Sequence, residues 1–146
     1  MKVAIGCDHA GLQLKNAVIE HLRQRGFEIT DCGTYDSASC HYPVFAQKVA
    51  AEVVSGNAEK GILVCGTGVG MSMAANKIKG IRAACVSDCF SAEATRAHND
   101  ANIVCFGQRV VGEGLAFKIV DAFLDTKFEG GRHQLRIDMV NELDNK

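Results

Sequence analysis

The 146-residue sequence contains no run of 18 apolar residues, which excludes a membrane-spanning helix of ordinary length. The amino-terminal segment reaches an acid at Asp8, before the apolar core of a secretion signal could form. Lys and Arg total 16 against 17 for Asp and Glu, a net charge of −1, which argues against a sequence-blind nucleic-acid binder. We therefore expect a soluble, unexported, cytoplasmic protein with no membrane or nucleic-acid partner.

Metal-binding and disulfide patterns are also missing. The seven cysteines are an odd number, and no two of them form the C-x-x-C pair of a zinc ribbon or a thioredoxin-type site. The five histidines contain no H-x-x-x-H pair. This pattern is typical of reduced thiols in a cytosol, so we expect no bound metal and no cofactor.

The sequence does contain short apolar runs that alternate with segments of helical period along its whole length. A chain of 15.6 kDa with 47% hydrophobic residues can build one full core, so we expect a single domain over residues 1–146. The alternation predicts an α/β fold, a three-layer α/β/α sandwich around a five-stranded parallel sheet. The expected strands are Lys2–Gly6, Phe27–Asp31, Gly61–Cys65, Ile81–Val86 and Asn102–Gly107.

Helices are expected between these strands. The segment over about 12–25 aligns Leu14, Val18 and Leu22 at four-residue steps and ends at Gly26, a residue suited to a helix end. Pro43 is the only proline and marks the start of a second helix, since the first turn tolerates it. Further helices are expected over residues 69–77, 91–98, 113–124 and 134–143.

Parallel sheets bind ligands where the loops converge at the carboxyl ends of the strands. One such loop, residues 65–70, reads C-G-T-G-V-G, and its three alternate glycines let backbone N–H groups face an anion at the start of the next helix. A tight turn without a ligand is the alternative interpretation. A P-loop needs a Gly-Lys pair, and a C-x5-R phosphatase needs an arginine, at the position where this chain has Met71. The spacing therefore excludes both. The dinucleotide pattern G-x-G-x-x-G does not match either, although Asp88 lies near the position of its expected acid.

Several reactive side chains lie at the ends of the expected strands and helices. Cys65 precedes a helix amino terminus, which favours the thiolate form of a base or nucleophile. Asp8 and His9 follow the first strand at the same edge, while His98 and Asn99 end another helix. The alternatives are an inert buried thiol, an Asp that caps a helix, and a His that caps free carbonyls. We expect most of the thiols of Cys7, Cys32, Cys85 and Cys105 to be inert.

Arg132 and Arg136 lie four residues apart, on one face of a helix that begins just after two glycines. Two guanidinium groups on that face suit a phosphate, since arginine binds phosphate oxygens in a bidentate fashion. A solvated basic face is the alternative.

The order and spacing of these motifs closely resemble the ribose-5-phosphate isomerase B and galactose-6-phosphate isomerase family from residue 1 to about residue 143. The segments that carry the resemblance are residues 6–11, 65–70, 74–77, 80–82, 98–100, 106–112 and 130–134. The resemblance implies a metal-free aldose–ketose isomerase with a Rossmann-like sheet. It also implies a homodimer whose active site takes residues from both subunits, and it leaves open whether dimers pair into tetramers.

By this resemblance, Cys65 is the base that moves a proton between C1 and C2 of the sugar through an enediolate, and Thr67 shuttles protons between the two oxygens. His98 opens the sugar ring with help from Asp8. We expect His98, Asn99 and Arg109 to come from the partner subunit. The residues expected to bind substrate are Asp8, His9, Tyr42, Gly66, Thr67, Gly68, Val69, Gly70, Asn99, Arg109, Arg132 and Arg136.

One segment departs from the family pattern and bears on which substrate is expected. The pentose-phosphate enzymes typically have Asp-Tyr-Pro where this chain reads His41-Tyr42-Pro43, and residues 31–43 look more like the B subunit of galactose-6-phosphate isomerase. The segments 98–100 and 130–134, which that subunit lacks, are intact here. We therefore expect interconversion of ribose 5-phosphate and ribulose 5-phosphate. The alternatives are galactose 6-phosphate or a related tetrose or hexose phosphate, and a non-catalytic sensor of sugar phosphates or nucleotides.

Overall fold

The computed structural model describes residues 1–146 and contains one sheet of five parallel strands in the order β2-β1-β3-β5-β4. The strands are β1 (Lys2–Cys7), β2 (Glu28–Asp31), β3 (Lys60–Cys65), β4 (Ala83–Cys85) and β5 (Ile103–Gly107). All five lie within two residues of the positions that the sequence predicts. The expected α/β sandwich is confirmed.

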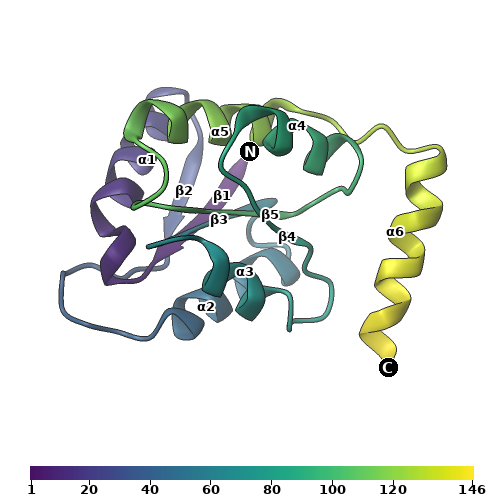
Figure 1. The fold of residues 1–146 in the computed structure, drawn as a ribbon, viewed down its shortest axis with the longest axis horizontal. Helices are drawn as coiled ribbons and strands as arrows, with labels where there is room; N and C mark the ends of the chain where they lie inside the picture. The colour runs from purple at the N-terminus through teal and green to yellow at the C-terminus, as the bar shows by residue number, and fades with distance from the viewer.

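Helices cover both faces of the sheet (Figure 1). One face is covered by α1 (Leu12–Gln24), α4 (Cys89–Ala97) and α5 (Glu113–Asp125), and the other by α2 (Tyr42–Val54) and α3 (Val69–Ala75). A sixth helix, α6 (Arg132–Glu142), follows α5, and two short 3₁₀ turns cover His9–Gly11 and Leu143–Asn145. None of the helices combines the length and apolarity that crossing a membrane requires.

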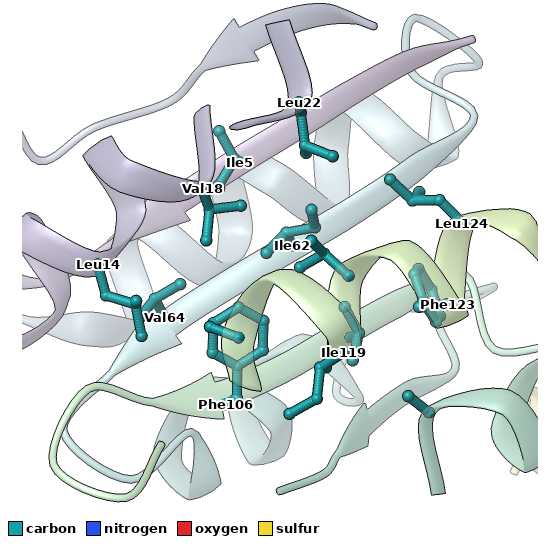
Figure 2. Close-up of a cluster of buried hydrophobic side chains, with 14 of the residues drawn as sticks. Ile5, Leu14, Val18, Leu22, Ile62, Val64, Phe106, Ile119, Phe123 and Leu124 are labelled. Carbon is teal, nitrogen blue, oxygen red and sulfur yellow. The ribbon is translucent and has the colours of Figure 1, made fainter. Parts of the chain in front are cut away.

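The core on the α1 and α5 side is the larger of the two (Figure 2). Because successive strand residues point to opposite faces, Ile5, Ile62 and Phe106 all point to this side. They meet the apolar stripes of the two helices, to which Leu14, Val18, Leu22, Ile119 and Phe123 belong. The four-residue spacing that predicts the first helix is therefore also the spacing of its buried face.

The core on the α2 side is built from smaller residues, so that helix packs close to the sheet. A Cβ atom on either Gly6 or Gly61 would lie only 2.8 Å from a methyl group of Val49. These two glycines therefore allow the close approach of α2 to β1 and β3.

Helix α6 belongs to neither layer and projects from the side of the sandwich (Figure 1). Only His133 and Ile137 of this helix are buried, while Leu135 and Met139 are 67% and 61% exposed. One side-chain hydrogen bond to the body runs from the Arg82 guanidinium to the Asn141 side chain at 3.1 Å. Helix α6 therefore carries apolar side chains that the rest of the chain leaves exposed.

Candidate active site

The carboxyl ends of β1 and β3 lie side by side at the point where the strand order reverses, since the chain runs from β1 outward to β2 and from β3 to the opposite side of the sheet. Ligands of open α/β sheets bind in the crevice at this switch point. The loop after β1 lies directly against the end of β3, because the backbone N–H of Asp8 donates to the carbonyl of Val64 at 3.3 Å. The two loops that the sequence singled out therefore meet at one edge.

Cys65 is the last residue of β3 and is only 5% exposed. The backbone N–H of Gly68 donates to its Sγ atom at 3.0 Å, a contact that stabilises negative charge on the sulfur. Gly68 has a left-handed φ of +83°, and a Cβ atom there would lie 2.7 Å from the backbone of Phe106. Only glycine fits this position, and the geometry of Gly68 in turn directs its N–H at the thiol.

The loop after Cys65 retains free hydrogen-bond donors. The backbone N–H groups of Gly66, Thr67 and Gly70 make no hydrogen bond within the chain, whereas that of Val69 donates to the Thr67 hydroxyl at 3.2 Å. Three unpaired donors around one turn can bind an anion or a developing oxyanion.

Two predicted binding residues pack on this loop. The guanidinium of Arg109 lies over Gly66, where a Cβ atom would come within 3.3 Å of it. The Tyr42 ring, at the start of α2, lies against Gly70, where a Cβ atom would come within 2.8 Å of the ring. The structure corrects one expectation here: the side chain of Arg109 lies at its own chain's loop rather than with His98 and Asn99, because Arg109 directly follows β5 at the carboxyl edge.

Asp8 is nearly buried, and one of its carboxylate oxygens accepts a hydrogen bond from the N–H of Ala10 at 3.0 Å. The capping role that the sequence left as an alternative is therefore real, but the second oxygen makes no hydrogen bond within the chain and can contact a ligand. His9 accepts at Nδ1 from the backbone N–H of Cys40 at 3.2 Å. That bond assigns the ring proton to Nε2, which makes His9 a donor toward a ligand.

The other thiols differ from Cys65 in their surroundings. Burial raises the pKa of Cys7 to about 12 and that of Cys32 to about 11. Burial also raises the pKa of Cys85, and that of Cys105 lies well above its usual value. These four thiols are protonated at neutral pH, as expected of inert cysteines.

A second group of predicted residues lies at the opposite edge of the sheet. Helix α4 starts after the carboxyl end of β4 and therefore ends near the amino ends of the strands, where Asn99 and Asp100 accept hydrogen bonds from Arg82. His98, Asn99 and Arg136 line one cavity of about 600 Å³ beneath α6. Arg132 begins that helix and is exposed. None of the residues of the Cys65 edge lines this cavity.

Sequence reasoning assigned no role to Glu129 or His133, although the structure places both against His98. Ligand atoms of these three side chains lie within 4.8 Å of one another, close enough to share a metal ion. The two imidazole rings, however, are stacked with only 15° between their planes, so their in-plane lone pairs run side by side instead of converging. Glu129 precedes α6, so the four-residue spacing to His133 gave no signal of a shared helical face.

The fold and site define a class of protein, an α/β domain with a thiol and a loop of unpaired backbone N–H groups at the switch point of a parallel sheet. Residues 3–140 match the Ribose/Galactose Isomerase family. The chain is 49% identical over 145 residues to ribose-5-phosphate isomerase B of Escherichia coli, covering 99% of this chain and 97% of that protein. The chain therefore belongs to the Ribose/Galactose Isomerase family and is an enzyme, an aldose–ketose isomerase.

Solved structures agree with this assignment. Ribose-5-phosphate isomerase B of Clostridium thermocellum superimposes with a TM-score of 0.98 at 48% identity, covering 99% of this chain and 98% of that chain. The enzyme of Mycoplasma genitalium, solved with bound ribulose-5-phosphate, superimposes with a TM-score of 0.94 at 44% identity, covering 99% and 97%.

Proposed function

We propose that this enzyme interconverts ribose 5-phosphate and ribulose 5-phosphate through an enediolate, with Cys65 as the base. The observation that supports this most is the Sγ atom of Cys65 beside three unpaired backbone N–H groups at the switch point of the sheet. The names of the three relatives described above agree, since each is a ribose-5-phosphate isomerase B and one was solved with bound ribulose-5-phosphate.

The central step is a proton transfer between two carbons. The Cys65 thiolate takes the proton from C2 of the open-chain aldose, and the C–H electron pair forms a C1–C2 double bond as negative charge moves to the oxygen on C1. The thiol then returns the proton to C1, while the Thr67 hydroxyl moves a proton between the two oxygens. A positioned base contributes about 10² to 10⁴ in rate. Backbone donors aimed at the oxyanion add a comparable factor, and the free N–H groups of Gly66, Thr67 and Gly70 are placed for this.

The aldose enters mainly as a closed ring, so ring opening precedes this step. His98 gives a proton to the ring oxygen as the bond between C1 and that oxygen breaks, and the electron pair of the bond stays on the oxygen. Asp8 accepts the proton of the hydroxyl on C1, whose oxygen becomes the carbonyl. The unpaired carboxylate oxygen of Asp8 is available for that role.

The phosphate is bound at the far end of the sugar by a donor imidazole and by arginines. His9 presents Nε2–H because Nδ1 is occupied by the N–H of Cys40. Arg109, Arg132 and Arg136 supply guanidinium groups that suit a phosphate.

The active enzyme is a homodimer in which each site combines two subunits. Within one chain, Cys65 and Asp8 lie at the carboxyl edge of the sheet, whereas His98 and Asn99 lie where α4 ends, near the amino edge. A second copy can bring its His98 to the Cys65 of the first. The exposed apolar residues of α6 and of the turn that follows it supply a surface for this contact, namely Leu135, Met139 and Leu143.

Galactose 6-phosphate is the second candidate substrate, and His41 is the observation that favours it. His41 stands at the start of α2 next to Tyr42, and its side chain makes no capping hydrogen bond, so it is free to contact a longer sugar.

A comparison of kcat/KM on ribose 5-phosphate and galactose 6-phosphate tests the proposal. We expect ribose 5-phosphate to be the better substrate, and a preference of about tenfold or more for the hexose would reverse the assignment. Exchange of the C2 hydrogen of the substrate with deuterated solvent separates an isomerase from a sensor, because a protein that only binds the sugar gives no exchange.

A further inference from the structure

Two residues that have no part in the proposed chemistry, Glu129 and His133, contact the side chain of His98. The imidazole rings of His98 and His133 stack with centroids 4.5 Å apart and 15° between their planes. A carboxylate oxygen of Glu129 lies 3.4 Å from Nε2 of His133 and 3.9 Å from Nε2 of His98. One carboxylate therefore faces both rings from the same side.

These contacts are held by backbone structure. The N–H of Glu129 donates to the carbonyl of Ala97 at 3.0 Å, which fixes the segment before α6 to the end of α4. Gly130 and Gly131 have φ values of +68° and +57°, which favour glycine and turn the chain into α6. The side chain of His133 is 9% exposed, whereas that of His98 is 46% exposed. The buried ring of His133 is thus held in place, and the more exposed ring of His98 stacks on it.

The charged groups around His98 are mainly cationic or already paired, so Glu129 is the carboxylate that faces its ring. Arg82 and Arg136 line the same cavity as His98 and disfavour a positive charge on its ring. The nearby carboxylate of Asp100 is paired with Arg82 and Arg96.

Asp144 also lines this cavity, and its carboxylate accepts from the N–H of Gly80. His133 itself shares the Glu129 carboxylate with His98. Glu129 provides the only carboxylate within 4 Å of the His98 ring nitrogens.

We propose that Glu129 and His133 are positioning residues that hold His98 as the acid of the ring-opening step. The Glu129 carboxylate stabilises the protonated ring through Nε2, and stacking on His133 fixes the plane of the ring. The Nδ1–H of His98, which makes no hydrogen bond in the chain, then points its proton at the sugar. This inference rests on the proposed function, because it assigns the two residues to one step of that reaction.

The substrates themselves allow this step to be measured separately. Ribose 5-phosphate is mainly a closed ring and needs an acid to open it. Ribulose 5-phosphate cannot close a five-membered ring, because the hydroxyl that would do so carries the phosphate. Exchange of a C1 hydrogen of ribulose 5-phosphate with deuterated solvent therefore reports proton transfer by Cys65 without ring opening.

The test compares Glu129→Gln and His133→Asn with the wild-type enzyme in both reactions. We expect kcat/KM for ribose 5-phosphate at pH 7.5 to fall by about tenfold or more, the scale of a weakened general acid. We expect hydrogen exchange from ribulose 5-phosphate to stay within about threefold of wild type, since general-acid assistance is not used there. Glu129→Asp keeps a carboxylate beside the ring and should restore part of the lost rate with ribose 5-phosphate, while hydrogen exchange from ribulose 5-phosphate stays unchanged.

The chain offers a matched control pair on α1 and α5. Nε2 of His21 lies 2.8 Å from a carboxylate oxygen of Asp121, and its ring stacks on Phe117 with centroids 4.4 Å apart. His21→Asn and Asp121→Asn therefore remove a similar stacked histidine and carboxylate far from His98, and both reactions should keep wild-type rates. Cys65→Ala should lose both reactions.

Equal losses of both reactions in Glu129→Gln, or no loss in either, would overturn the positioning role while leaving the proposed function intact. A wild-type enzyme that neither isomerises ribose 5-phosphate nor exchanges the C1 hydrogen of ribulose 5-phosphate would overturn the proposed function itself.

Discussion

At the scale of single residues, the chemistry depends on how differently the chain treats its seven cysteines. Cys7, Cys32, Cys85 and Cys105 have raised pKa values because burial penalises the thiolate. Cys65 is also buried, yet it receives a backbone N–H at 3.0 Å. A directed backbone donor stabilises negative charge on this sulfur, whereas the thiols of Cys7, Cys32 and Cys85 face carbonyl oxygens.

Replacing Cys65 tests its role as the base. We expect Cys65→Ala to lower kcat by about 10² or more, since a positioned base is lost. The affinity for ribose 5-phosphate should change little, because the arginines and backbone donors remain. Rates come from a coupled assay of ketose formation, and binding comes from calorimetry. If a tenth of the wild-type rate survives, another group is the base.

Alkylation should follow the order of thiolate stability. At pH 9 a thiol with a pKa of about 12, as for Cys7, is ionised to only about 0.1%, and one with a pKa of about 11, as for Cys32, to about 1%, so both react slowly. We expect iodoacetamide to modify Cys65 well before Cys7, Cys32 or Cys105, and substrate to protect Cys65. Peptide mapping by mass spectrometry measures the order. Labelling of Cys7 ahead of Cys65 would contradict this account of the two thiols.

At the scale of secondary-structure elements, an ion pair joins the buried Lys15 of α1 to Asp31, the last residue of β2. The Lys15 side chain is fully buried, and its Nζ lies 2.6 Å from a carboxylate oxygen of Asp31 and 2.8 Å from the carbonyl of Thr34. The same carboxylate accepts the N–H of Gly33. The N–H of Cys7 in turn donates to the carbonyl of Gly33, so this loop is tied to the end of β1 just before Asp8.

Breaking this pair from either side should have unequal effects on stability. Asp31→Asn leaves a buried ammonium without its counter-ion and should lower the free energy of unfolding by about 3 kcal/mol or more. Lys15→Met removes the buried charge and leaves Asp31, whose side chain is 27% exposed, in contact with water, so it should cost less. Urea denaturation of the two variants measures the difference. A larger loss for Lys15→Met would show that packing of the lysine stem outweighs its charge.

At the scale of the whole molecule, the residues of the proposed site lie in two separate parts of the chain. Cys65 and Asp8 lie at the carboxyl edge of the sheet, and His98 lies under α6 near the amino edge. A symmetric dimer can place the two parts together twice, once at each site.

Co-expression of two inactive variants tests this arrangement. Each site of the dimer would use Cys65 from one subunit and His98 from the other, so a Cys65→Ala and His98→Asn heterodimer has one intact site. Random pairing then restores about a quarter of the wild-type rate. The control pairs Cys65→Ala with Asp8→Asn, two residues at the same edge of the sheet, and should restore nothing. A first pair as inactive as this control would show that each chain acts alone.

The sequence by itself determined the elements and the loops that carry reactive groups. Its apolar runs and the spacing of Leu14, Val18 and Leu22 fixed strands and helices, because burial follows a period of 2 or 3.6 residues. The glycines after Cys65 likewise marked the turn that leaves backbone N–H groups unpaired, because their conformational requirement is local.

Only the tertiary structure decided which of these groups meet. Arg109 packs over Gly66 of its own chain, Cys40 fixes the ring proton of His9, and Glu129 faces His98 across 31 positions of sequence. Such contacts depend on strand order and on where a loop is anchored, and neither leaves a periodic signal in the chain. The position of α6 outside the two layers is of the same kind, since an amphipathic helix specifies that one face is covered but not by which surface.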